Sequence, residues 1–219
     1  MHILSLGANC YPAAYIKEFL KPDNKETQLF DTLGTSMWSI NKLIEERFEG
    51  IIDRHNFKDI QHREGEGTIV TNTRYNVRFL HDLQFAIQAR SLTFRARMTR
   101  RIPRIEAIFR EAPQLLLIRY QEIQARRIQH GPPTDEYAEL CRFAALLRSK
   151  YRQNNFVIAY IAERESGWDE ENRILTVHIP STDIPYEGCG AVIADRMSSH
   201  LPFINSKLDP RPSTAPSTT

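Results

Sequence analysis

The stretch HILSLGANC, residues 2–10, decides the fold expected for this chain. Its first residues form an apolar run that predicts a short buried strand, and Gly7 supplies the turn that leaves this strand. Pro12 follows at an early helical position, where its missing N–H costs nothing. The sequence therefore predicts a strand, a tight turn and a helix, with Cys10 at the mouth of the helix.

The position of Cys10 suggests a functional hypothesis. The unpaired N–H groups and the dipole at a helix mouth favour an anion, so a thiol there tends toward the thiolate. Asn9, its neighbour, can donate a hydrogen bond to an oxyanion. The alternative is a structural one, in which Cys10 is a small buried hydrophobe that ends the strand, as free cysteines often are.

The composition of the chain limits the classes of protein to which it can belong. The chain of 219 residues is 41% hydrophobic and 26% charged, with a net charge of +2. These values are typical of one compact soluble domain, which we expect over residues 1–207, followed by a disordered Pro/Ser/Thr-rich tail over residues 208–219. The small net charge gives no reason to expect a nucleic-acid partner.

The cysteines and the apolar runs indicate the compartment. Three scattered cysteines are too few for a disulfide framework, and no C-x-x-C pair suggests structural zinc. The N-terminus lacks the pattern of a signal peptide, and no apolar run approaches the length of a membrane span. We therefore expect a cytoplasmic protein without a bound metal, a cofactor or a membrane partner, and leave its oligomeric state open.

The rest of the chain predicts helices that alternate with strands. Helices are expected over about 12–20, 36–48, 92–111, 134–151 and 191–200, with Ser36 and Thr134 as caps and a kink or fresh start at Pro103. Strands are expected over 114–119, 156–161 and 174–179, with a hairpin over 68–79 that turns near Asn72 and an exposed excursion over 54–67.

This order predicts an α/β fold, with a mostly parallel sheet flanked by helices. A strand, a helix and a second strand in sequence demand a right-handed crossover and a parallel pair. In such sheets ligands bind beyond the carboxyl ends of the strands, where Cys10 would lie.

A thiol nucleophile needs a base within hydrogen-bond reach and a group that orients this base. His81 is the candidate base, because it closes a strand-like run and has Asp82 beside it. Adjacent residues of a strand point to opposite faces, so Asp82 orients His81 only if the strand bends or ends there. Asp31, set between apolar residues, is the other candidate. The alternative is that His81 is a surface or structural histidine.

Five motifs resemble, in the same order, those of a bacterial family of papain-like cysteine peptidases whose function is otherwise unknown. They are LSLGANC at 4–10, LFDT at 29–32, HDL at 81–83, RRIPRI at 100–105 and LLIR at 116–119. The chain departs from the family pattern at Leu29 and Thr32, where the family has Pro and Trp, and at Pro103. The resemblance implies Cys10 as nucleophile, His81 as base, Asp31 or Asp82 as the third group, and a papain-like α+β fold as the alternative architecture.

Arginines gather in and around the predicted helix 92–111, and no acidic residue lies between Asp82 and Glu106. Arginine forks bind carboxylate or phosphate in a bidentate manner, which predicts an anion clamp. The candidate substrate-binding residues are Arg100, Arg101, Arg104 and Arg119. The alternative is a solvated helix face, with some arginines paired to carboxylates such as Asp31. Nucleic acid is disfavoured, because Phe94 is the single nearby stacking aromatic.

Three functions remain open on the sequence alone. The first is a cysteine-dependent hydrolase, a papain-like peptidase or an acyl transferase, that acts on an acyl, peptide or acidic small-molecule substrate. The second is an SGNH-like esterase, in which Asp195 and His200 serve Cys10 at the same sheet edge. The third is a non-catalytic module that holds an anion or a partner on its arginine-rich helix.

Overall fold

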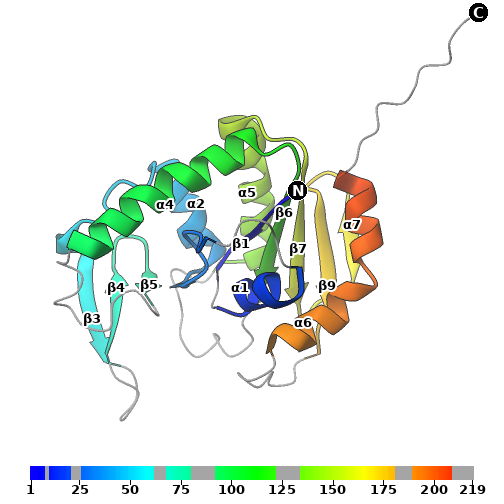
Figure 1. Cartoon of the computed structure of the whole chain (residues 1–219), viewed down its shortest axis with the longest axis horizontal. Helices are drawn as coiled ribbons and strands as arrows, with labels where there is room; N and C mark the ends of the chain where they lie inside the picture. The colour runs from blue at the N-terminus through cyan, green and yellow to red at the C-terminus, as the bar shows by residue number, and fades with distance from the viewer. Residues whose placement is uncertain are drawn as a thin grey trace, which may run out of the picture.

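The computed structural model describes residues 1–7, 10–20, 26–61, 68–79, 92–121, 134–180 and 189–208. Within these residues, the larger sheet has five strands in the order β1 (His2–Ser5), β6 (Leu115–Tyr120), β7 (Phe156–Ala162), β9 (Ile174–His178) and β8 (Gly167–Asp169). The first four are parallel, and β8 runs antiparallel to β9. The α/β fold with a mostly parallel sheet is therefore confirmed (Figure 1).

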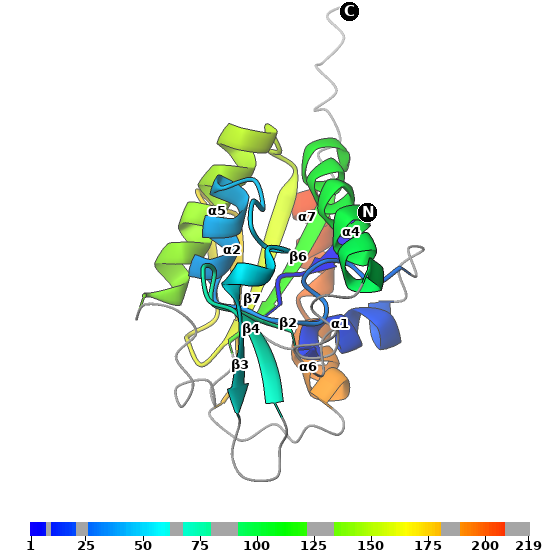
Figure 2. The same cartoon turned by 90° about the vertical axis from the view of Figure 1, so that its left-hand side faces the viewer.

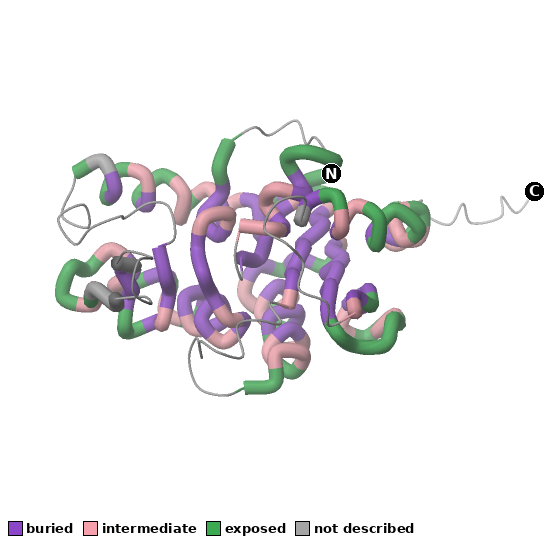
Figure 3. The backbone as a smooth tube through the Cα atoms, turned by 90° about the horizontal axis from the view of Figure 1, so that it is seen from below, coloured by how far each residue is buried: buried purple, intermediate pink, exposed green. Residues whose placement is uncertain are grey.

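The central strands β6 and β7 are buried along their whole length, as Figure 3 shows for the middle of the molecule. Their continuous apolar sequence reflects cover on both faces, where an exposed face would demand alternation. Alternate residues enter opposite cores: Leu117 and Ile158 belong to one, and Leu116 and Val157 to the other. The sequence runs LLLI and FVIA thus encode a two-sided sheet.

Different helices cover the two faces. One core receives residues from α2 (Met37–Glu45), α4 (Leu92–Glu111) and α5 (Glu136–Tyr151). The other receives residues from α1 (Tyr11–Tyr15), the π-helical turn η1 (Ile16–Leu20), α6 (Cys189–Ser198) and α7 (Leu201–Leu208). Helix α7 was not predicted from the sequence. Beyond Leu208, which ends α7, the predicted disordered tail lies outside the described residues.

A second, antiparallel sheet stands beside the first. Its order is β2 (Leu33–Gly34), β5 (Val77–Phe79), β4 (Thr68–Asn72) and β3 (Phe57–Gln61), and the predicted hairpin over 68–79 is confirmed as β4 and β5. The expectation that residues 54–67 form an exposed excursion is wrong for residues 57–61, which form β3. The cause is Phe57, which packs edge-on against Phe79 and Phe94 at ring-centroid distances of 5.5 and 6.0 Å.

Helix α4 connects the two sheets (Figures 1 and 2). Near its start Phe94 packs against Phe79 of the small sheet, and near its end Phe109 packs against Phe143 of α5. The helix continues through Pro103, so of the two expectations there the fresh start is wrong, and the kink stays a prediction. Pro103 and Thr99, whose carbonyl loses its helical partner, both lie on the exposed side, where water can satisfy that carbonyl.

The helix caps follow the chemistry of their residues. Ser36 caps α2 as predicted, and its Oγ accepts a hydrogen bond from the Ser39 N–H at 3.1 Å. The cap of α5 is Asp135 instead of the predicted Thr134, and its carboxylate accepts from the Tyr137 N–H at 2.9 Å. A carboxylate caps as well as a hydroxyl and also complements the helix dipole, which explains this shift by one residue.

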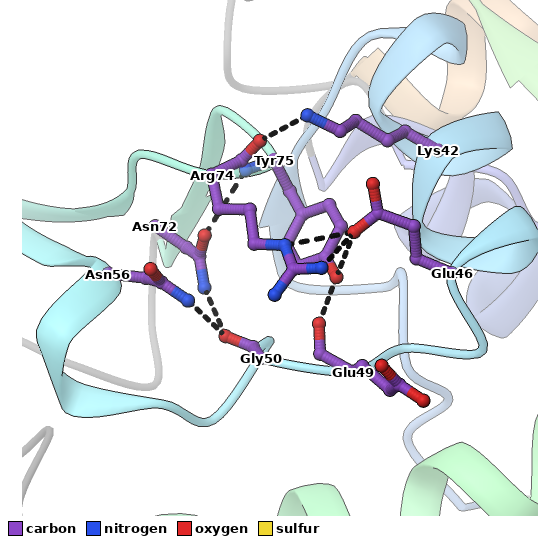
Figure 4. A network of polar contacts seen from close by, with 8 residues as sticks. All are labelled: Lys42, Glu46, Glu49, Gly50, Asn56, Asn72, Arg74 and Tyr75. Atoms are coloured by element: carbon purple, nitrogen blue, oxygen red, sulfur yellow. Dashed lines mark hydrogen bonds and ion pairs between the residues drawn. The ribbon is translucent and has the colours of Figure 1, made fainter.

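A polar network ties the end of α2 to the β4–β5 turn (Figure 4). Arg74 and the Tyr75 hydroxyl both donate to Glu46 Oε2, at 2.9 Å each from Nε and Oη. Asn56 and Asn72 both donate to the Gly50 carbonyl at 3.0 Å. Because the Tyr75 side chain is fully buried in the core, this network links the core to the polar groups at the end of α2.

Candidate active site

The segment around Cys10 has the predicted course of strand, turn and helix. β1 ends at Ser5, Cys10 is the N-cap residue of α1, and Pro12 lies in the first turn. The Cys10 carbonyl accepts from the Ala14 N–H at 2.9 Å, and the residue is partly buried. Cys10 therefore lies beyond the carboxyl end of a parallel strand, at the edge strand β1.

Gly7 leads out of the strand in a backbone conformation that favours glycine. Its φ of +70° lies in the left-handed region that favours glycine, and its N–H donates to the Ser5 Oγ at 3.1 Å. A Cβ atom on Gly7 would lie well within 3.0 Å of the Thr35 Oγ1 and 3.3 Å from the Leu33 carbonyl oxygen. The turn before Cys10 thus packs directly on the segment that follows β2.

The guanidinium of Arg119, at the end of β6, joins three segments near this turn. Its Nη1 donates to the Leu6 carbonyl and its Nη2 to the Thr35 carbonyl, both at 2.8 Å. Its Nε donates to Glu136 Oε1 at 2.6 Å, and the side chain is 3% exposed. The turn before Cys10, the segment after β2 and the start of α5 therefore meet at one buried cation.

Asp31 lies in the apolar setting that the sequence predicted, since Phe30 and Leu33 on either side are fully buried. Its Oδ2 accepts from the Gln28 N–H at 2.7 Å. Burial raises the pKa of Asp31, against the opposing effects of this hydrogen bond and of the Arg101 charge. A carboxyl group with a raised pKa beside a specific cation is a candidate functional group.

Comparison with known proteins gives the family. The family model described as "Putative papain-like cysteine peptidase (DUF1796)" matches residues 1–166. The chain belongs to this family. Comparison with curated proteins and with solved structures gave no match.

Membership of the papain-like cysteine peptidase family confirms the resemblance inferred from the sequence and supports a cysteine-type hydrolase. The matched range contains Cys10, Asp31 and His81, whereas Asp195 and His200 lie beyond its end. The residues proposed for the hydrolase thus fall inside the family match, whereas the two partners that the SGNH-like alternative assigns to Cys10 fall outside it.

Three of the predicted site residues, Asn9, His81 and Asp82, lie outside the described residues. Their roles stay predictions from the sequence and the family resemblance. Among the described histidines, His200 lies in the turn between α6 and α7, and its N–H donates to the Met197 carbonyl at 3.0 Å. Asp195 of the SGNH-like alternative has a side chain that is 78% exposed and lies 3.9 Å from Arg196.

The arginines of α4 differ in their surroundings. Arg104 Nη1 lies 2.7 Å from Glu26 Oε2, and Arg101 acts electrostatically on Asp31, whereas Arg100 is exposed. Arg104 therefore pairs with a carboxylate of its own chain, and the charge of Arg101 lowers the pKa of Asp31. Their role in substrate binding stays a prediction.

A second cysteine, Cys141 on α5, has a polar surrounding that the sequence pattern did not reveal. Burial, followed by the charge of Asp169, raises the pKa of its thiol. Nearby, the Tyr137 hydroxyl donates to Asp169 Oδ2 at 2.9 Å, and the Arg164 guanidinium lies 4.0 Å from the Tyr137 ring centroid. Because the thiolate is the nucleophile of cysteine chemistry, a thiol with a raised pKa is expected to react slowly, and Cys141 can serve as an internal reference for Cys10.

Within the part of the chain that the structure describes, no group of three or more His, Cys, Asp or Glu residues is arranged to bind a metal ion. Among the same residues, none of the helices combines the length and the apolar character that a membrane span requires.

Proposed function

We propose that this chain is a cysteine-dependent hydrolase or acyl transferase, with Cys10 as nucleophile and His81 as general base. The observation that carries this proposal is the position of Cys10. It caps a helix beyond the carboxyl end of a parallel strand, in a member of the papain-like cysteine peptidase family. We place the activity in the cytoplasm, where a reducing environment keeps a thiol available.

In the proposed reaction, His81 takes the proton of the Cys10 thiol, and the sulfur attacks the carbonyl carbon of an acyl substrate. Asn9 and backbone N–H groups at the start of α1 stabilise the oxyanion that forms. The intermediate collapses to a thioester as the leaving group departs with the proton from His81. Water, or a second acceptor in a transferase, then attacks the thioester, returns its proton to His81 and releases the acyl group.

The pairing of β2 with β5 supports Asp31 as a group that could orient His81, and Asp82 stays the alternative. β2 and β5 are antiparallel, and Leu33 pairs with Phe79. Asp31 precedes Leu33 by two residues, and His81 follows Phe79 by two. Two residues span at most about 7 Å, so Asp31 and His81 each lie within that distance of the paired residues Leu33 and Phe79. This support comes from chain connectivity alone, because Asp31 lies in a turn in which the Leu33 N–H donates to the Phe30 carbonyl at 3.3 Å.

The substrate that we propose is an acyl, peptide or acidic small molecule. Arg100 is exposed on α4, and Arg101 and Arg104 lie on the same helix beside the segment that carries Asp31. An arginine fork recognises a carboxylate through two parallel hydrogen bonds, so these residues would favour an acidic group on the substrate.

Covalent labelling tests the proposal. The purified chain is treated with a peptidyl epoxide and a peptidyl fluoromethyl ketone, and the labelled residues are identified by peptide mass spectrometry. We expect Cys10 to react at least about tenfold faster than Cys141, whose partly buried thiol has a raised pKa. Hydrolysis of amide, ester and thioester reporters, measured in parallel, identifies the bond that is cut.

Matched histidine variants assign the base. We expect His81→Ala to slow the labelling of Cys10 by about 10²–10⁴-fold, as the loss of a general base does. His178→Ala is the control, because His178 is exposed at the end of β9, and its ring contacts the Arg164 carbonyl. An unchanged rate in His81→Ala, or a Cys10 that reacts no faster than Cys141, would contradict the proposal. A loss of rate in His200→Ala would instead favour the SGNH-like esterase.

A further inference from the structure

We infer that Arg119 is a positioning residue for Cys10, and that its buried guanidinium sets the place of the turn before the nucleophile. The inference rests on the proposed function of Cys10. The sequence suggested instead that Arg119 binds the substrate. A side chain that is 3% exposed and bonded to three acceptors of its own chain has little left to offer a substrate carboxylate.

Leu6, the last residue before Gly7, is hydrogen-bonded through both of its backbone groups. Its N–H donates to the Ile118 carbonyl at 2.9 Å, which continues the β1–β6 ladder beyond Ser5. Its carbonyl accepts from Arg119 Nη1. Both backbone groups of Leu6 are thus bonded to β6, so the chain enters the turn from a fixed point.

A second contact lies on the other side of the turn. Thr35 is 1% exposed, and its Oγ1 fills the space that a Cβ on Gly7 would need. The Thr35 carbonyl accepts from Arg119 Nη2. One guanidinium therefore bonds to Thr35 and to Leu6, the neighbour of Gly7, and it holds the chain that leads to Cys10 against the segment that follows β2.

The buried charge of Arg119 is also balanced. A buried cation is tolerated when a nearby anion and hydrogen-bond acceptors compensate it. Glu136, in the first turn of α5, supplies the anion at 2.6 Å and is itself 20% exposed. The planar guanidinium has donors in three directions, and the ammonium of a lysine is a single point that cannot reach three separated acceptors at once. Arginine at position 119 is therefore required by geometry as well as by charge.

The test separates binding from reactivity at Cys10. The variant Arg119→Lys keeps the charge and loses the fork, and its labelling by the peptidyl epoxide is resolved into an inactivation rate constant and an inhibition constant. We expect the rate constant to fall at least about tenfold, because a 1 Å misplacement of a reacting group costs on the order of 100-fold. The inhibition constant should stay within about twofold, and the labelling of Cys141 should not change.

Three further variants control the test. Arg142→Lys is the control, because Arg142 is an exposed arginine of α5 that pairs with Glu45 at 2.6 Å. Glu136→Gln keeps an acceptor for Arg119 Nε and replaces Arg119→Lys if that variant does not fold, with an expected fall of several-fold. Methylguanidine added at a non-denaturing concentration should restore part of the rate in Arg119→Ala, which a general loss of stability would not allow.

The outcomes are distinct. A raised inhibition constant with an unchanged rate constant would overturn the inference in favour of substrate binding. A lowered melting temperature with an unchanged rate constant would overturn it in favour of a purely structural role. If Cys10 of the unmodified chain is not labelled selectively, the proposed function itself fails and the inference with it.

Discussion

Replacing Gly7 by alanine should be among the most destabilising single-methyl additions in this chain. Gly7 has a φ of +70°, and the left-handed region costs a residue with a side chain roughly 1–2 kcal/mol. The new Cβ would also lie well within 3.0 Å of the Thr35 Oγ1, and such overpacking in a buried place costs typically about 1–3 kcal/mol. Together these costs predict that Gly7→Ala lowers the free energy of unfolding by about 3 kcal/mol.

Two other glycines serve as controls. Gly50 has a φ of +77°, but a Cβ there meets only the ends of flexible side chains, Arg74 Nη1 and Asn56 Nδ2, at 3.0 Å each. Gly50→Ala should therefore cost about 1–2 kcal/mol, the conformational cost alone. A Cβ added to Gly167 would meet nothing within 4 Å, so Gly167→Ala should change the stability by less than about 0.5 kcal/mol. Urea unfolding followed by tryptophan fluorescence measures all three variants.

A double-mutant cycle isolates the steric part of the Gly7 effect. Thr35→Ala removes the Oγ1 atom, and the contact of the new Cβ with the Leu33 carbonyl at 3.3 Å then remains as a mild one. In this background Gly7→Ala should cost about as much as Gly50→Ala, with a coupling energy of about 1–2 kcal/mol. Equal costs for Gly7→Ala in both backgrounds would refute the reasoning, and so would a Gly7→Ala cost no greater than that of Gly50→Ala.

Two further predictions concern buried polar groups. Burial raises the pKa of Asp31, so the folded chain binds its proton more tightly than the unfolded chain, and stability falls as the pH rises from the ordinary carboxyl range through the raised pKa. Asp31→Asn should therefore stabilise the chain at pH 7 and flatten this pH dependence, as measured by urea unfolding. The same variant should slow the labelling of Cys10. A loss of stability at pH 7 would contradict the raised pKa of Asp31. Tyr75→Phe removes a hydroxyl that donates to Glu46, and should cost about 1.5–3 kcal/mol, as hydrogen bonds to charged groups do. Urea unfolding checks it, and a cost below about 0.5 kcal/mol would show that the network of Figure 4 adds little.

The elements that the sequence predicted well are those in which several consecutive residues are apolar and therefore buried. β7 is an uninterrupted apolar run and β6 begins with four apolar residues, LLLI, so their strand state and their central place follow from the local sequence. The end of β1 and the start of α1 were equally predictable, because Gly7 and Pro12 each favour a known backbone conformation. Local chemistry decides these features, and no distant partner is needed to predict them.

The features that the sequence did not predict depend on distant partners. β2 has two residues, too few to show any periodicity, and it exists because Leu33 pairs with Phe79. The bonds of Arg119 are of the same kind, since its acceptors lie at residues 6, 35 and 136. A motif can show that an arginine ends an apolar strand, but no spacing in the sequence encodes three acceptors from three separate segments.

The locally predictable elements and the long-range contacts together explain how the candidate site is built. Cys10 follows a strand of the large sheet, and Asp31 precedes a strand of the small sheet, so the site depends on how the sheets are joined. The two-residue ladder of β2 is a weak link for that purpose, because a short strand contributes few hydrogen bonds. α4 supplies the join at long range through Phe94 and Phe109. Arg119 supplies it at short range, through its bonds to the carbonyls of Leu6 and Thr35.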